Sequence, residues 1–272
     1  MEEKINTKSL LKSLSKDTLI YGIGGVLAKS ISFLALPLLT RIFSPYEYGQ
    51  IEIVAIMSTF FGTFIALGMD ASQSFYFFKY KSYDIKKQSK LVSSIIQFRI
   101  IFGVIVILVS TFISPFLNNI FFDGSLSKEL FLIAFTGSLF QQILHQSADV
   151  LRLIFRPIPY IFIVLIQTIL SNLLIIYSIL ILKSGIYGYF LAITLASFLA
   201  ALISFFYIKR YINFSKIHYD QWPKLLNFGL PIFAAGLADY FMNTSDRWFI
   251  QYFHDSSDVG IFGIAAKFTI LL

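Results

Sequence analysis

The sequence predicts an all-α fold, a polytopic helical membrane protein, and three observations carry this prediction. Hydrophobic residues make up 57% of the 272-residue chain and charged residues only 14%, whereas a soluble domain carries about 25% charged residues. The mean hydropathy is +0.75. Several apolar runs exceed the ~18 residues that mark a membrane-spanning helix, and they lack the alternation typical of transmembrane strands.

The spans follow from the apolar runs and from the polar loops between them. The first run begins at Thr18 and outlasts the 7–15-residue core of a signal peptide, so we expect an uncleaved span over 18–42. A basic loop at 70–90 separates the second span from the third, and further basic loops follow the fourth and the sixth. The expected spans are 18–42, 50–69, 91–116, 130–149, 157–182, 186–208 and 225–250, with an eighth starting at Val259.

The basic residues outside the spans are distributed unevenly between the two sides of the membrane. One side would carry the N-terminal lysines and the basic residues of 70–90, 152–156 and 209–224, and the other only Lys128 and Lys183. Cytoplasmic loops collect Lys and Arg. We therefore expect a multi-pass protein of the inner (cytoplasmic) membrane with its N-terminus in the cytoplasm. The same bias explains the net charge of +7 without a nucleic-acid partner.

Two lysines are expected deep in the membrane. Counted from the starts of their spans at 1.5 Å per residue, Lys29 lies about 16 Å deep and Lys267 about 13 Å deep. A charge there costs at least ~2.5–3.5 kcal/mol, so it usually faces a polar cavity or a partner. We expect these two lysines to line a shared cavity.

Three arginines also fall within spans or at their ends. Arg41 and Arg247 lie near the outer face, where long side chains can reach the interface. Arg99 lies deeper, where it could pair with a carboxylate that the sequence does not identify. Asp239 and Asp246 share a helical face of the seventh span. Elsewhere in the spans, Ser, Thr and Gln at helical spacing indicate hydrogen bonds between helices.

The two ends of the chain contain similar segments. "FSPYEYGQIEIVAI" from Phe43 and "FHDSSDVGIFGIAAKF" from Phe253 each contain a Phe, an acidic turn, a Gly and an apolar helix. A weaker similarity relates Tyr21 to Phe228, six spans later. Repeated six-helix halves are typical of transporters, with the substrate site between the halves. We expect one six-helix lobe at 1–212 and the first two helices of a second lobe at 213–272.

The segments "TSDRWFIQYFHDSSDVGIFGIAAKF" and "LPLLTRIFSPYEYGQIEIV" resemble the polysaccharide flippases of the multidrug/oligosaccharidyl-lipid/polysaccharide exporter superfamily. This resemblance implies translocation of polyprenyl-pyrophosphate-linked oligosaccharides in surface polysaccharide biosynthesis. It implies as partners the lipid-linked oligosaccharide, membrane lipids and other polysaccharide-assembly membrane proteins. Cationic cavity residues of the family would fall on Lys29, Lys267, Arg41 and Arg247. The candidate substrate-binding residues are these four together with Asp239 and Asp246, of which Asp246 is expected to pair with Arg247.

Three alternatives remain open. A drug/cation antiporter of the same superfamily needs a carboxylate in the first lobe, and the first span offers Lys29 instead. A membrane glycosyltransferase or polymerase needs a catalytic constellation, and the sequence shows no catalytic residues, metal site or cofactor motif. The third is an inactive fragment of a flippase: the run from Gly260 to Leu272 rises only about 20 Å against a core of ~30 Å, so we expect an incomplete flippase.

Overall fold

The computed structural model describes residues 7–80 and 84–269, and in this part of the chain the fold is all-α. The prediction of a polytopic helical protein is confirmed. The helices are α1 (Thr7–Ile42), α2 (Pro45–Ala66), α3 (Met69–Lys79), α4 (Ile85–Phe122), α5 (Lys128–Leu153), α6 (Pro157–Leu180), α7 (Gly185–Ile208), α8 (Trp222–Phe253) and α9 (Ser256–Thr269), with 3₁₀ turns η1 (Lys209–Tyr211) and η2 (Tyr219–Gln221) before α8.

Six stretches of the described chain are long and apolar enough to cross a membrane, which makes this a multi-pass membrane protein. Among the helices expected to span, α5 and α9 fall outside this set. The described part of α9 has 14 residues. α5 has 26 residues but carries several Gln, His and Asp side chains, and it packs against α7, α4 and α2.

The expectation of a loop over 70–90 is wrong for most of its length. α2 ends at Leu67 and Gly68, whose φ angles are 42° and 70°, and this left-handed turn is a common helix stop. α3 then starts at Met69 and buries Met69, Ser72, Gln73, Tyr76 and Phe77. The charged residues at the two ends of 70–90 are typical of a loop, but the first half of this segment is aromatic and packs, as α3, against α8 and α4. Residues 81–83 lie outside the described chain.

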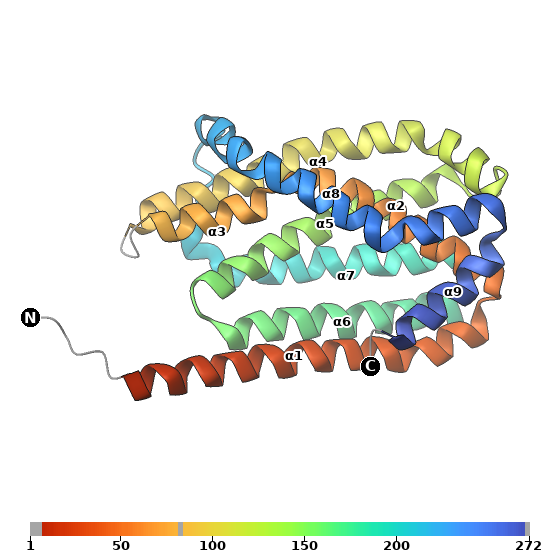
Figure 1. Cartoon of the computed structure of the whole chain (residues 1–272), viewed down its shortest axis with the longest axis horizontal. Coiled ribbons are helices and arrows are strands. Elements are labelled where there is room, and N and C mark those ends of the chain that lie inside the picture. Colours follow the sequence, from red (N-terminus) through yellow and green to blue (C-terminus); the bar gives the residue numbers. More distant parts are fainter. Residues whose placement is uncertain (1–6, 81–83, 270–272) are drawn as a thin grey trace, which may run out of the picture.

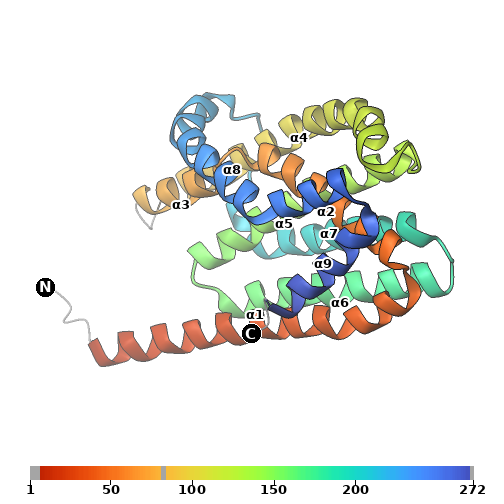
Figure 2. The same ribbon diagram turned by 45° about the vertical axis from the view of Figure 1, so that its right-hand side comes forward.

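The helices run roughly side by side along the long axis of the molecule (Figures 1 and 2). α1 lies against α6, α6 against α7, and α7 against α5, which form one side of the bundle. On the other side α8 packs along α3 and α2, and α9 packs against α2. α1 and α8 therefore lie on opposite sides of the bundle (Figure 1).

The two similar segments form the starts of α2 and α9. The Ser44 hydroxyl accepts from the backbone N–H of Glu47 while the Glu47 carboxylate accepts from that of Ser44, a capping box. The Asp255 carboxylate likewise accepts from the N–H groups of Ser257 and Asp258, at 2.8 and 3.1 Å. The acidic turn of each segment is thus a helix cap.

Glycines allow the backbones of these two helices to touch. A Cβ atom added to Gly260 would lie 2.1 Å from the Pro45 carbonyl oxygen, and one added to Gly49 would lie 1.6 Å from the Ser256 oxygen. At the other end of α2, a Cβ on Gly68 would lie 2.1 Å from the Gly229 oxygen of α8. Side chains cannot fit at these points, so α2 is held by glycine contacts at both of its ends.

The partner of Arg99 is Asp70. The Arg99 side chain is fully buried, and its Nη2 lies 2.5 Å from Asp70 Oδ1. Its Nη1 donates to the Gln142 carbonyl oxygen, while its Nε has no partner among the described residues. A buried guanidinium needs such compensation, and here the pair links α4 to the start of α3.

Candidate functional site

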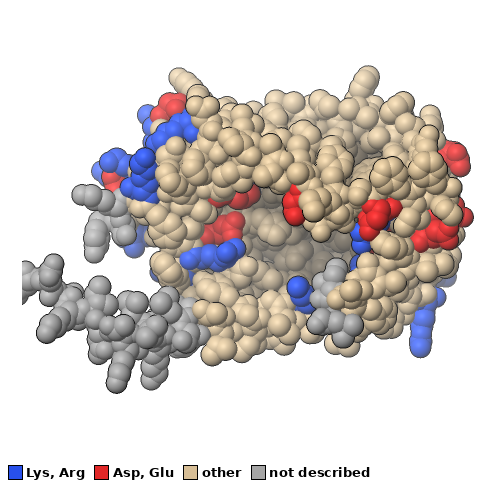
Figure 3. All heavy atoms as spheres, in the orientation of Figure 1, with Lys and Arg blue, Asp and Glu red and all other residues tan. Residues whose placement is uncertain are grey.

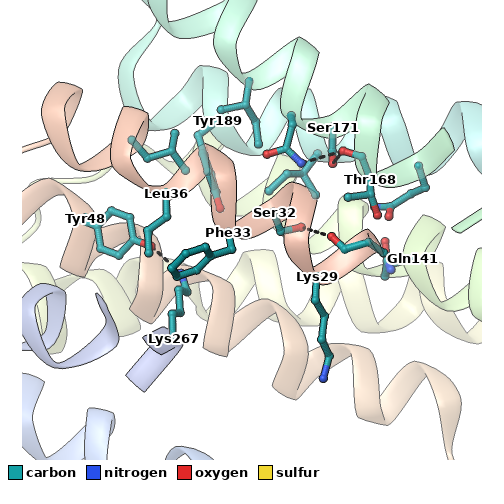
Figure 4. A pocket seen from close by; sticks show the side chains of 16 residues that line it. Lys29, Ser32, Phe33, Leu36, Tyr48, Gln141, Thr168, Ser171, Tyr189 and Lys267 are labelled. Carbon is teal, nitrogen blue, oxygen red and sulfur yellow. Dashed lines mark hydrogen bonds between the residues drawn. The ribbon is translucent and has the colours of Figure 1, made fainter. Parts of the chain in front are cut away.

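Lys29 and Lys267 line one cavity of about 580 Å³, between α1, α6 and α7 on one side and α2 and α9 on the other. Its polar lining comes from several helices at once (Figure 4). The polar residues that line it are Lys29, Ser32, Tyr48, Gln141, Gln167, Thr168, Ser171, Asn172, Tyr189 and Lys267.

Lys29 supplies an uncompensated positive charge to this cavity. It makes no ion pair or hydrogen bond with any residue in the described part of the chain. Its side chain is exposed, and in Figure 4 its ammonium group extends away from the other labelled side chains. An unpaired cation on a cavity favours an anionic ligand, because the attraction between opposite charges is stronger away from bulk water.

Lys267 lines the same cavity but has partners. Its ammonium group pairs with the Glu52 carboxylate and donates to the Tyr48 hydroxyl at 2.6 Å. It also lies 4.9 Å from the centre of the Tyr48 ring. The Glu52 side chain is only 13% exposed. The charge of Lys267 is therefore compensated by Glu52 of α2. Lys29 and Lys267, which have similar expected depths in the sequence, thus differ in whether they have an acidic partner.

The other four candidate residues do not line this cavity. Arg41 and Asp239 are exposed at the end of α1 and on α8. The Arg247 guanidinium lies 3.3 Å from Asp246 Oδ1, donates to the Asn243 carbonyl oxygen and stacks on Phe262 of α9. The pairing expected of Asp246 is present, and a role of these four residues in substrate binding stays a prediction.

Sequence reasoning missed the polar face of α6. Gln167, Thr168, Ser171 and Asn172 recur one turn apart in an otherwise apolar span and all face the cavity. Their spacing was the available signal, and it was not singled out in the sequence. The Thr168 and Ser171 hydroxyls donate to carbonyl oxygens of α6 itself, at 2.9 and 3.0 Å, so their remaining acceptor capacity faces the cavity.

The cavity has the composition of a binding site and lacks that of a metal centre. No group of three or more His, Asp or Glu side chains suited to a metal ion occurs within residues 7–80 and 84–269. What the cavity provides is one uncompensated cation, amide and hydroxyl groups on α6, and a compensated lysine on α9.

Residues 14–272 match the sequence profile of the Polysaccharide biosynthesis protein family. The chain belongs to this family. The match spans all of the described helices except the first turns of α1, and it agrees with the resemblance carried by the two similar segments.

Two similar proteins come from Haemophilus influenzae. An uncharacterised membrane protein is 24% identical over 266 residues, which are 96% of this chain and 61% of that protein. A product of the Lsg locus is 22% identical over 265 residues, which are 94% of this chain and 61% of that protein. The chain thus spans about three fifths of the length of these relatives.

A solved structure shares the fold of this family member. The lipid II flippase MurJ in an inward closed conformation superposes with a TM-score of 0.70 at 20% identity, over 93% of this chain and 55% of MurJ. At this identity the likeness concerns the fold, and it supports the arrangement of the helices around the cavity.

Proposed function

We propose that this chain is part of a transporter that moves polyprenyl-pyrophosphate-linked oligosaccharides across the membrane. The observation that carries the proposal is the uncompensated Lys29 in a cavity of about 580 Å³, within a member of the polysaccharide biosynthesis family. The expected setting is the inner membrane with the N-terminus in the cytoplasm, and the expected partners are membrane lipids and other polysaccharide-assembly membrane proteins.

The chemistry of such a substrate suits the cavity. Its pyrophosphate loses water when it enters the membrane, and a lysine replaces that hydration through charge-assisted hydrogen bonds. The hydroxyl and amide groups of Thr168, Ser171 and Asn172 on α6 provide further polar contacts opposite α1. An inside-negative potential helps the outward step by about 2.3 kcal/mol per negative charge at 100 mV.

The carboxylates support an anionic cargo over a cationic one. In the described chain, Glu52 pairs with Lys267, Asp70 with Arg99, and Asp149 with Arg152. A drug/cation antiporter requires a carboxylate that is free to hold the cation, and these three are already compensated. We likewise favour transport over catalysis, because the cavity holds binding groups and the matching family and fold are those of transporters.

The test uses the complete protein that contains this chain, in a strain that lacks its own polysaccharide flippase. Lys29→Ala should reduce surface polysaccharide strongly, since a lost charge-assisted contact costs about 1.5–3 kcal/mol, or roughly 10–100-fold in affinity. Lys29→Arg should retain most activity. Lys183→Ala, in an exposed loop, is the matched control and should behave as wild type.

Protein levels are compared by immunoblot in every strain. Equal export by Lys29→Ala, Lys29→Arg and wild type would refute the proposal. Resistance to cationic drugs that depends on the protein, without restored polysaccharide, would support the antiporter instead.

A further inference from the structure

A second cavity, of about 880 Å³, lies nearer the start of α1. It lies along three of the same helices as the first cavity, because α1, α5 and α6 contribute residues to both. On α1 the second cavity is lined by Gly22 and the first by Lys29, and seven residues of helix separate them by about 10 Å. Figure 3 shows a hollow on this face of the molecule with acidic and basic side chains at its edge.

Charges in the second cavity are compensated. Asp70 is paired with the buried Arg99 at 2.5 Å, and Asp149 with Arg152 at 3.1 Å. The cavity is therefore polar without a net charge from these four residues, unlike the cavity of Lys29. Such a site favours a ligand that has many hydrogen-bonding groups and no charge of its own, because an unpaired charge here would lack a counter-charge.

Aromatic side chains form part of the wall. Phe155 lines the cavity and is 63% exposed. Its φ angle of 54° belongs to the cap that ends α5, in which the Phe155 N–H donates to the Arg152 carbonyl oxygen and the Arg156 N–H to that of Leu151. Tyr160 also lines the cavity and packs edge-on against Tyr21, with ring centres 5.2 Å apart. The two rings therefore give the cavity an apolar surface beside its charged and polar side chains.

We infer that this second cavity binds the sugar part of the lipid-linked substrate while Lys29 holds its pyrophosphate. The inference rests on the proposed function and names the ligand of a second subsite. A neutral sugar has hydroxyl groups that donate to Asp70 and Asp149 and accept from Arg152, and its apolar C–H faces suit the Phe155 and Tyr160 rings. The first sugar is joined directly to the pyrophosphate, so two subsites about 10 Å apart along α1 match the order of the groups in the substrate.

The experiment measures binding of two lipids to the complete protein in nanodiscs. The probes are polyprenyl pyrophosphate and polyprenyl-pyrophosphate-linked N-acetylglucosamine, each with the same polyprenyl chain. Two or three added hydrogen bonds predict that wild type binds the sugar-linked lipid about 10-fold more tightly.

Two variants remove the sugar subsite by different means. The double variant Asp149→Asn/Arg152→Gln removes one positive and one negative charge, so the net charge is unchanged. Phe155→Gly removes the aromatic ring. Because glycine adopts a positive φ angle readily, Phe155→Gly should not lower the thermal stability of the protein. Phe155→Tyr is the matched control, because it retains the ring. Both subsite variants should bind the two lipids equally, with the affinity for the sugar-free lipid unchanged, and Phe155→Tyr should keep the preference.

The inference is overturned if wild type shows no preference for the sugar-linked lipid, or if the subsite variants keep it. It is also overturned if they weaken both lipids equally. Lys29→Ala reports on the proposed function separately, because it should weaken both lipids by the same factor. Unchanged binding of the sugar-free lipid by Lys29→Ala would count against the pyrophosphate site, whatever the sugar variants show.

Discussion

Gly260 offers the sharpest test of how α9 packs on α2. In Gly260→Ala the added Cβ would lie 2.1 Å from the Pro45 carbonyl oxygen and 3.1 Å from the Gly49 nitrogen. A comfortable C···O contact is about 3.3 Å or more, so α9 would have to move by roughly 1 Å. The obstructing atoms are backbone and cannot rotate away. Overpacking of this kind costs about 1–3 kcal/mol.

Gly236→Ala on α8 is the matched control, because its added Cβ meets no heavy atom within 4 Å. Helix propensity alone predicts that this change stabilises the protein by about 0.5–1 kcal/mol. Unfolding of both variants in mixed micelles with increasing SDS should therefore separate them by about 1.5–4 kcal/mol. If the two variants had the same free energy of unfolding, the close backbone contact between α2 and α9 would be refuted.

Three further predictions concern other parts of the fold. Asp70→Asn leaves the buried Arg99 charge uncompensated and should destabilise the protein by about 2–4 kcal/mol. This is below the full cost of breaking a buried pair, because the Asp70 side chain is 39% exposed. The double variant Asp70→Asn/Arg99→Met should recover much of the lost stability in the same SDS titration. Ser44→Ala removes the α2 cap and should cost about 1 kcal/mol, whereas Ser44→Asp should not. In intact cells an impermeant thiol reagent should label Asn119→Cys and spare Lys216→Cys; the reverse pattern would contradict the charge bias of the loops.

The helical membrane fold and most helix positions were predictable from the sequence. Apolar runs of 20 or more residues have few structural alternatives, because every backbone group inside a membrane must be hydrogen-bonded within its own segment. The acidic turns before α2 and α9 were likewise predictable, and the structure shows that they are helix caps at Ser44 and Asp255, each of which depends on residues two or three positions apart. The family resemblance rested on the two segments that contain these caps.

The α2–α3 boundary was not predictable in the same way. Leu67 and Gly68 stop α2 through two left-handed residues, and only one of them is a glycine. Whether α3 forms after such a stop depends on what its aromatic face packs against, and that surface belongs to α4 and α8. The local sequence pattern therefore indicated a loop, whereas packing against α4 and α8 stabilises the helix α3.

The depth of a lysine follows from residue counting, because a helix rises by a fixed 1.5 Å per residue. The sequence by itself predicts how deep Lys29 and Lys267 lie in their expected spans, and it indicates that Arg99 could pair with a carboxylate without naming it. Only the tertiary structure decided that Lys267 is compensated by Glu52, that Lys29 is not, and that Asp70 is the partner of Arg99. Pairing depends on the distance between side chains from different helices, and helix packing sets that distance.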